Sequence, residues 1–235
     1  VATFLNAESS SEIIFTSGTT DSINLVAATF GRKFLQKGDE VIISEIEHHA
    51  TLHTVEELRC RGEAELSYVK LMADGGIDLE NLEELLSGHQ AKTLVTLMHA
   101  NNEIGTLLNL HAVGNLCKKY GAIFHSDTVQ TVGHFPIDLR NTPVHFITGA
   151  GHKFHGPKGV GLLYINENIK IKPYIHGGGQ ERNMRAGTEN LYGIVGFAKA
   201  LEIATGDYEK DSEYIRGLKM YSMQQLSSHI KGVVF

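Results

Sequence analysis

The sequence predicts an α/β fold in which a mostly parallel sheet is combined with helices. The first observation is that short apolar runs alternate with amphipathic segments of helical length along the whole chain. The second is that no repeat, low-complexity segment or linker divides its 235 residues. The third is composition, because 42% hydrophobic and 20% charged residues are typical of an ordinary globular chain. One large domain is therefore expected.

Seven apolar runs have the length and residue types of buried strands. Each contains four to seven residues, most of them β-branched, aliphatic or aromatic, as strands favour. In chain order they are 12–16, 40–44, 66–69, 93–99, 122–125, 145–148 and 160–165.

Three segments between these runs repeat apolar residues at the spacing of one helix face. Asp78 is expected to cap the second helix, and Gly121 is expected to end the third. The apolar positions are Ile23, Val26, Ala27, Phe30 and Phe34, then Leu79, Leu82, Leu85 and Leu86, and last Leu110, Val113, Cys117 and Tyr120.

Charge, hydropathy and cysteine content exclude several classes of function. A formal net charge of -6 without any basic run argues against a nucleic-acid partner. No apolar stretch approaches the roughly 20 residues that span a bilayer, and no export signal is visible, so a membrane partner is not expected. Cys60 and Cys117 are far apart and in helical patterns, which predicts two buried thiols in a reducing cytoplasm, with no disulfide and no metal site.

The segment 16–21, TSGTTD, joins a predicted strand to a predicted helix. Free N–H groups and the helix dipole make such a turn a binding site for phosphate. The hydroxyls of Thr19 and Thr20 are candidates to add hydrogen bonds. The alternative is that one of these threonines only caps the helix.

A histidine pair follows the run 40–44. Ligands of parallel sheets bind beyond the carboxyl ends of strands, so an imidazole there is placed to stack on a flat cofactor and to transfer protons. Two alternatives remain: a solvated pair, or a metal site made of His48, His49 and His53. The metal alternative lacks a carboxylate or cysteine at a typical zinc spacing.

Polar residues also follow the runs 93–99 and 122–125. Asp127 is placed to hydrogen-bond a protonated pyridine nitrogen and so strengthen the ring as an electron sink, while Gln130 is placed to reach a phenolic oxygen. The alternative is a helix cap, which is the more frequent role of a lone aspartate at a strand end. Asn101 and Asn102 either contact a cofactor edge or close a turn.

Lys153 lies beside His152 in the glycine-rich stretch 151–161, GHKFHGPKGVG. A lysine in such a setting is a candidate to hold an aldehyde cofactor, above all pyridoxal phosphate, as a Schiff base. On its own the stretch is explained equally well by a surface lysine in a Gly/Pro loop. A further glycine-rich segment, 177–188, is expected to form a mobile loop that brings arginine and threonine to an anion, in this subunit or a partner.

Taken together, these segments resemble the class V aminotransferase-type enzymes that use pyridoxal 5'-phosphate, and within that group the cysteine desulfurases. The matching segments are TSGTT (16–20), IEHHA (46–50), MHANNEIGT (98–106), HSDTVQTVGHFPIDL (125–139), GHKFHGPKGVG (151–161) and GGGQERNMRAGTEN (177–190). The resemblance implies the large domain of a fold type I transferase, a three-layer sandwich around a mostly parallel sheet.

The resemblance also implies a role for each site residue. Lys153 would form the Schiff base and His48 would stack on the ring, and these two are the expected catalytic residues. The other cofactor contacts would be Asp127 at the pyridine nitrogen, Gln130 and Asn102 at the ring's oxygen side or the substrate, Thr19, Thr20 and His152 at the phosphate, and Thr188 at the phosphate of the other subunit of a homodimer.

The chain departs from the family pattern in two places. The family usually has Ser or Thr two residues before the His152–Lys153 pair, where this chain has Gly151 preceded by Ala150. In the family the persulfide-forming cysteine follows the Schiff-base lysine by well over a hundred residues, whereas no cysteine follows Lys153 here. Residues 1–205 are therefore expected to form the cofactor-binding large domain. Residues 206–235 would begin the helical connection to a small C-terminal domain, with both ends of the chain cut.

The resemblance implies conversion of L-cysteine to L-alanine, with sulfur passed as an enzyme persulfide to an acceptor or scaffold protein for iron–sulfur cluster assembly or thiolation. Without the nucleophilic cysteine this chain should not complete sulfur transfer, and release of alanine by the chain alone would refute that expectation. The alternatives are a selenocysteine lyase and a non-catalytic fragment that binds pyridoxal phosphate or serves as a scaffold.

Overall fold

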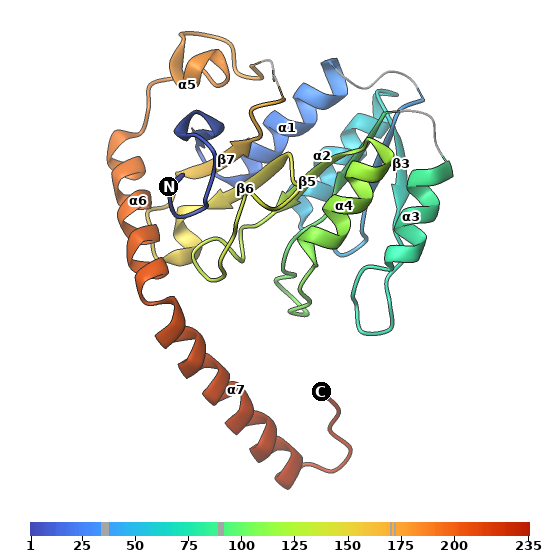
Figure 1. Ribbon diagram of the computed structural model, residues 1–235, viewed down its shortest axis with the longest axis vertical. Helices are drawn as coiled ribbons and strands as arrows, with labels where there is room; N and C mark the ends of the chain where they lie inside the picture. The colour runs from blue at the N-terminus through green and yellow to red at the C-terminus, as the bar shows by residue number, and fades with distance from the viewer. Residues whose placement is uncertain (34–37, 89–91, 170, 172) are drawn as a thin grey trace.

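The computed structural model describes residues 1–33, 38–88, 92–169, 171 and 173–235. Its centre is one seven-stranded sheet with the order β1-β7-β6-β5-β4-β2-β3 (Figure 1). The strands are β1 (Ile13–Thr16), β2 (Glu40–Ile43), β3 (Glu65–Tyr68), β4 (Thr93–Thr96), β5 (Ile123–Asp127), β6 (Phe146–Ala150) and β7 (Gly161–Ile165).

Strand direction brings the ends of five separate strands to one edge of the sheet. The strands β3, β2, β4, β5 and β6 pair in parallel, while β7 is antiparallel to both β6 and β1. β1 therefore runs in the same direction as β6. Segments that follow β1, β2, β4, β5 and β6 all emerge at the same edge, where ligands of such sheets bind.

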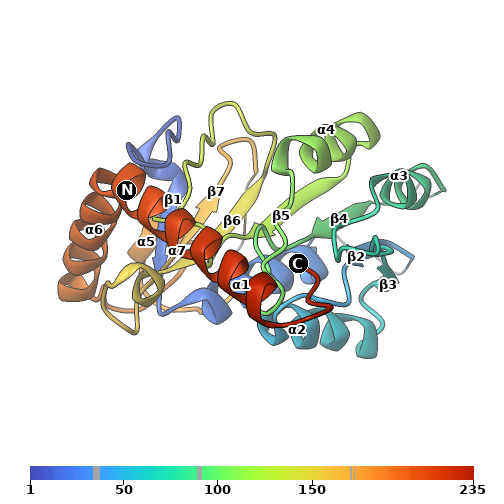
Figure 2. The same ribbon diagram turned by 90° about the horizontal axis from the view of Figure 1, so that it is seen from below.

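Helices cover both faces of the sheet, which confirms the predicted three-layer α/β fold. In Figure 2, α1 and α2 lie on one side of the strands, and α3 and α4 lie on the other. Strand residues alternate between two cores: Ile42 and Phe124 pack with one helical layer, whereas Ile43 and Leu94 pack with the other. The helices are α1 (Thr19–Lys33), α2 (His49–Cys60), α3 (Leu79–Gly88), α4 (Leu110–Tyr120), α5 (Gln180–Asn183), α6 (Leu191–Gly206) and α7 (Tyr208–His229), with short 3-10 turns at Ser10–Glu12 and Gly151–Phe154.

Both predicted helix signals are confirmed. The Asp78 carboxylate accepts a hydrogen bond from Asn81 N at 3.0 Å, and Gly121 ends α4 in the left-handed conformation with φ 68°. All seven predicted strands are present, although the run 93–99 is too long. β4 ends at Thr96; beyond it, Leu97 N and His99 N still donate to carbonyls of β5, and the chain then turns. Phe34, expected on the first helix, lies outside the described residues.

One prediction about the cysteines is wrong. Cys117 is fully buried, and burial raises the pKa of its thiol to about 12, so it is an inert core residue. Cys60 is exposed because it is the last residue of α2, where the helix face turns to solvent. Both thiols are free.

The last helix extends away from the rest of the molecule. α6 packs against the sheet layer through Phe197 and Leu201, but α7 contains no buried residue (Figure 1). The break between the two helices at Asp207 lies close to the boundary expected between 205 and 206. Among the described residues, no helix is both long and apolar enough to cross a membrane.

Candidate active site

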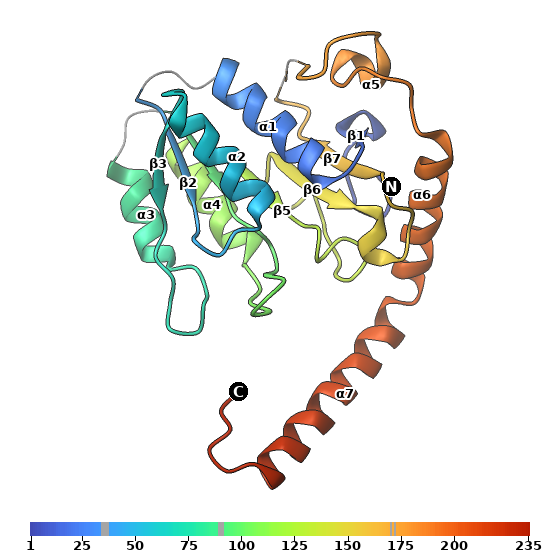
Figure 3. The same ribbon diagram turned by 180° about the vertical axis from the view of Figure 1, so that it is seen from behind.

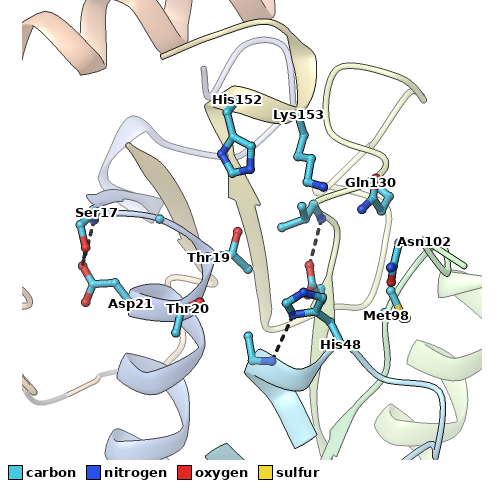
Figure 4. A pocket seen from close by; sticks show the side chains of 14 residues that line it. Ser17, Thr19, Thr20, Asp21, His48, Met98, Asn102, Gln130, His152 and Lys153 are labelled. Carbon is cyan, nitrogen blue, oxygen red and sulfur yellow. Dashed lines mark hydrogen bonds between the residues drawn. The ribbon is translucent and has the colours of Figure 1, made fainter. Parts of the chain in front are cut away.

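A cavity of about 350 Å³ opens at the edge of the sheet where the five strand ends meet. Every cofactor-contacting residue predicted from the sequence lines it except Thr188. Figure 4 shows the side chains of His48, His152, Lys153 and Thr19 pointing into the same space. The lining residues are Ser17, Gly18, Thr19, Thr20, Asp21, His48, Ala50, Met98, Asn102, Asp127, Val129, Gln130, His152 and Lys153.

Lys153 is presented to this cavity by a tight turn after β6. The 3-10 turn Gly151–Phe154 ends at His155, which is left-handed with φ 66°, and Gly156 N donates to Gly151 O at 2.8 Å. A Cβ on Gly151 would lie 2.9 Å from the Phe197 ring, so the turn packs too closely on α6 for a larger residue. Phe154 is buried beneath the turn, and the amine of Lys153 is left exposed in the cavity.

The predicted phosphate turn follows β1 and opens α1. Ser22 Oγ bonds Thr16 Oγ1 at 2.8 Å and Leu162 O at 3.1 Å, which fastens the turn to β7. Among the described residues, the buried Thr19 Oγ1 has no hydrogen-bond partner, so the turn does not use it as a helix cap. An orphaned hydroxyl at a helix N-terminus that faces a cavity fits an anion that would complete its hydrogen bonding.

The close approach of Gly161 to Gly18 gives a test of this turn. A Cβ at position 161 would lie 2.7 Å from Gly18 Cα and 2.8 Å from Gly149 O, both of which are backbone atoms. We expect Gly161→Ala to lower the free energy of unfolding by about 1–3 kcal/mol and to weaken phosphate binding at the turn. Urea unfolding and a titration with inorganic phosphate measure the two effects. Gly206→Ala is the matched control, because no described residue outside its own stretch of α6 lies within 4 Å of the added Cβ; it should leave phosphate binding unchanged and should not lower the free energy of unfolding.

Asp127 ends β5 at the floor of the cavity. Its Oδ1 accepts a hydrogen bond from Val129 N at 3.0 Å, which is a local turn and not a helix cap. Burial raises the pKa of this carboxyl to about 6, against the opposing effects of the Val129 bond and the Lys153 charge. A cationic ring nitrogen placed beside the carboxylate would favour the ionised form.

His48 faces the cavity from the turn between β2 and α2. Its Nδ1 accepts a hydrogen bond from Ala50 N at 3.1 Å and so caps α2, which fixes the ring's orientation. Burial, with smaller effects from His49 and Lys153, lowers the pKa of the imidazole, and a neutral ring suits stacking on an aromatic ligand. His49 and His53 stack on each other 5.0 Å apart instead. Within the described part of the chain, no three His, Cys, Asp or Glu side chains gather as metal ligands would.

The two adjacent asparagines have different roles. Asn101 is buried and closes a turn: its Oδ1 accepts hydrogen bonds from Glu103 N and Ile104 N, and its Nδ2 donates to Ile46 O at 2.8 Å. Asn102 is exposed and lines the cavity. Gln130 also lines it, on the segment that follows Asp127.

Thr188 is not brought into this cavity. It is exposed and lies in a smaller pocket of about 220 Å³ with Gly159, Glu181 and Arg185. A role for Thr188 in the site of another subunit therefore stays a prediction.

Glu47 is a buried carboxyl next to the site that the sequence analysis did not single out. Its Oε1 accepts hydrogen bonds from Ser44 Oγ at 2.7 Å and Met98 N at 3.1 Å, which ties the His48 turn to the segment after β4. Its Oε2 is buried and has no partner among the described residues. Burial raises the pKa of this carboxyl to about 8, and nearby Asp127 contributes in the same direction. Burial therefore favours the protonated, neutral form of Glu47. Its position directly before His48 was the available signal.

A raised pKa in the folded state makes stability depend on pH. The folded chain holds the Glu47 proton more tightly than the unfolded chain, so this contribution to stability is lost as pH rises from 4.5 to about 8. In this window the free energy of unfolding of the parent chain should fall by up to about 1.4 kcal/mol per pH unit because of Glu47. We expect Glu47→Gln to lack this fall. Urea unfolding between pH 5 and 9 measures it, with the exposed neighbour variant Glu45→Gln as control. Parallel pH profiles for Glu47→Gln and the parent chain would contradict the assignment.

Six further lining residues had not been singled out: Ser17, Gly18, Asp21, Ala50, Met98 and Val129. Each belongs to a segment that the sequence analysis had placed at a strand end and that also contains a predicted residue. Side-chain direction within these irregular segments decides which neighbour faces the cavity, and periodicity does not reveal it.

The fold and the cavity define an α/β protein with a lysine, a phosphate-type turn and a buried carboxylate converging at the sheet edge. The aminotransferase class-V family matches residues 1–235, so the chain belongs to this family. It is 41% identical over 224 residues to a protein of Dictyoglomus turgidum named cysteine desulfurase IscS, covering 95% of this chain and 56% of that protein. A Clostridium botulinum protein of the same name is 39% identical, with 99% and 58% covered.

Solved structures agree with the fold. A NifS-like protein superposes with a TM-score of 0.89 at 39% identity, covering 96% of this chain and 62% of that one. The NifS-like protein of Rickettsia africae gives 0.88 at 34% identity, covering 99% and 64%. A structure described as SspA in complex with cysteine gives 0.80 at 35% identity, covering 86% and 58%. The chain spans a little over half the length of the curated relatives it matches.

Proposed function

We propose that this chain binds pyridoxal 5'-phosphate and forms the cofactor-binding part of a cysteine desulfurase. The observation that carries the proposal is the convergence of Lys153, Asp127 and the Thr19 turn on one cavity. The donor set fits the cofactor: an orphaned hydroxyl and a helix N-terminus suit its phosphate, and a buried carboxylate suits its ring nitrogen. The exposed Lys153 amine suits its aldehyde.

Each residue then has a stated action. Thr19, Thr20 and His152 would hold the phosphate, His48 would cover one face of the ring, and Asp127 would keep the ring nitrogen protonated. When bound, the cofactor supplies an aldehyde for the substrate's amino group and a ring that withdraws electrons from its Cα. Lys153 would attach the cofactor covalently, and then Lys153 Nζ or His48 would move the proton at the substrate Cα. Gln130 and Asn102 would bond the ring's oxygen side or the substrate.

L-cysteine is the substrate that the relatives favour. Both curated relatives described above are named cysteine desulfurases, and one similar structure is described as a complex with cysteine. These names do not favour a selenocysteine lyase. The products would be L-alanine and a sulfur atom carried as a persulfide, which an acceptor or scaffold protein would receive for iron–sulfur cluster assembly or thiolation.

Three features of the whole protein follow from the same proposal. Residues 1–205 would be the large domain, with 206–235 leading to a small domain that carries the sulfur nucleophile. The protein would act as a cytoplasmic homodimer in which Thr188 reaches the partner's phosphate. Such an interface is supported by exposed apolar residues at the start of α6, shortly after Thr188: Leu191, Tyr192 and Val195.

Exchange of the substrate Cα proton tests the proposal without requiring a sulfur nucleophile. The chain loaded with pyridoxal phosphate is incubated with L-cysteine in D₂O, and deuterium at Cα and free alanine are followed by mass spectrometry. We expect exchange without alanine release. Faster exchange of L-selenocysteine would favour the lyase, and cofactor binding without any exchange would favour the non-catalytic fragment. A chain that binds no cofactor would overturn the proposal.

A further inference from the structure

Three charged residues of the segment 181–185 attach to the segment that carries the phosphate turn. Arg182 Nη2 donates to Ile13 O at 2.6 Å, and the Glu181 carboxylate accepts a hydrogen bond from Phe15 N. Both contacts reach the backbone of β1, an edge strand of the sheet. In Figure 3, α5 lies directly above β1. The segment 181–185 is therefore held against the edge strand β1 and is not a free loop.

The third of these residues, Arg185, reaches a residue of the cavity itself. Its Nη2 and Nε donate to Asp21 Oδ2 at 2.9 and 3.2 Å. The same oxygen accepts hydrogen bonds from Ser17 N at 2.9 Å and Ser17 Oγ at 3.0 Å, and the latter pair lies at the left of Figure 4. The side chains of Arg185 and Asp21 are only 20% and 11% exposed, so water screens their ion pair weakly.

Three consecutive residues of the same segment have left-handed backbone, so several contacts must hold the segment in place. Glu181, Arg182 and Asn183 have φ of 45°, 56° and 63°, a conformation that costs non-glycine residues free energy. Successive residues of this kind persist only where surrounding contacts hold them. The contacts to Ile13, Phe15 and Asp21 are the ones that do so here.

The charge of Asp21 conflicts with the ligand proposed for this turn. Asp21 and Ser17 both line the cavity beside Thr19, where the phosphate would sit. A phosphate monoester carries a charge of about −1.5 to −2 at neutral pH, and an unpaired carboxylate at the same turn would repel it. An arginine paired with that carboxylate cancels the repulsion while the carboxylate keeps its bonds to Ser17.

We propose that Arg185 is a positioning residue of the phosphate-binding turn, which neutralises Asp21 and holds its carboxylate on Ser17 so that the turn accepts a dianion. This inference rests on the proposed function, because it deepens the account of how the cofactor's phosphate is bound. It assigns to the glycine-rich segment 177–190 a role within its own subunit. That role is separate from the one predicted for Thr188 in a partner subunit.

A charge-balanced set of variants tests the inference by equilibrium titration with pyridoxal phosphate. Arg185→Met leaves Asp21 unpaired and should weaken binding about tenfold or more. The double variant Asp21→Asn with Arg185→Met removes both charges and should bind within about threefold of the parent chain. Arg185→Lys keeps the charge and should also bind within about threefold. Arg182→Met is the matched control, because it removes the neighbouring hydrogen bond to Ile13 O and leaves the Arg185–Asp21 pair intact.

The outcomes separate charge from structure. Recovery in the double variant supports the proposal, whereas a double variant as weak as Arg185→Met would overturn it. If Arg185→Met does not fold, Asp21→Asn carries the test, since loss of a repelling charge should leave binding equal or tighter. Binding weakened tenfold by Asp21→Asn would then contradict the proposal.

Inorganic phosphate distinguishes failure of this inference from failure of the proposed function. Phosphate should raise the melting temperature of the parent chain more than that of Arg185→Met, whether or not an aldehyde reacts. If phosphate stabilises the parent chain more than Arg185→Met but pyridoxal phosphate does not bind, the role of Arg185 in the turn is supported and the cofactor assignment fails. If pyridoxal phosphate binds equally well to every variant, the cofactor stands and the role of Arg185 fails.

Discussion

Replacement of Lys153 by alanine is expected to abolish covalent retention of pyridoxal phosphate by the chain. Lys153 is the lysine whose side chain lines the cavity, and the turn Gly151–Phe154 holds it there. Without its amine, the cofactor would be held only by hydrogen bonds and stacking, and gel filtration should remove it. The measurement is cofactor absorbance that co-elutes with protein.

Lys158→Ala is the matched control for this loss. Lys158 is exposed in the same glycine-rich stretch, five residues on, and does not line the cavity. It should retain the cofactor as the parent chain does. If Lys153→Ala also retained it through gel filtration, another amine would be the attachment point and the role given to Lys153 would be wrong.

Replacement of Asp127 by asparagine is expected to produce the second largest effect. A hydrogen bond between a buried carboxylate and a protonated ring nitrogen is worth about 1.5–3 kcal/mol, so the dissociation constant of pyridoxal phosphate should rise about 10- to 150-fold. Burial already raises the pKa of this carboxyl to about 6, so the neutral amide should not destabilise the chain without cofactor. Weaker binding would then report lost contact and not unfolding.

Asp138→Asn controls for the general effect of losing a carboxylate. Asp138 bonds Asn6 and Asn141 away from the cavity, and these contacts lower the pKa of its carboxyl. This variant should bind the cofactor with unchanged affinity. Equal affinities for Asp127→Asn and the parent chain would show that the carboxylate does not face the ring nitrogen.

The sequence predicted the fold well because its signals are local. Apolar runs marked every strand, and Asp78 and Gly121 marked helix ends, since capping geometry depends on a few neighbouring residues. The prediction that Cys60 is buried was wrong for a related reason. A helical pattern places a residue on a helix but does not say whether its terminal turn faces the core or solvent.

The site was predicted in part because strand ends of a parallel sheet converge. That rule placed His48 and Asp127 at ligand-binding strand ends, whereas Lys153 was predicted from its glycine-rich stretch and the family resemblance; all three line one cavity. It did not reveal Glu47 or the pairing of Asp21 with Arg185, since these join residues 51 and 164 positions apart. Such contacts depend on how loops pack after the sheet has formed, and no periodicity encodes them.

Borohydride reduction with peptide mapping tests the central claim most directly. The chain is incubated with pyridoxal phosphate, reduced, digested and analysed by mass spectrometry. A pyridoxyl group confined to the peptide that contains Lys153 is the result expected if the cavity is a cofactor site. No adduct, or adducts scattered over many lysines, would contradict the assignment of this cavity to pyridoxal phosphate.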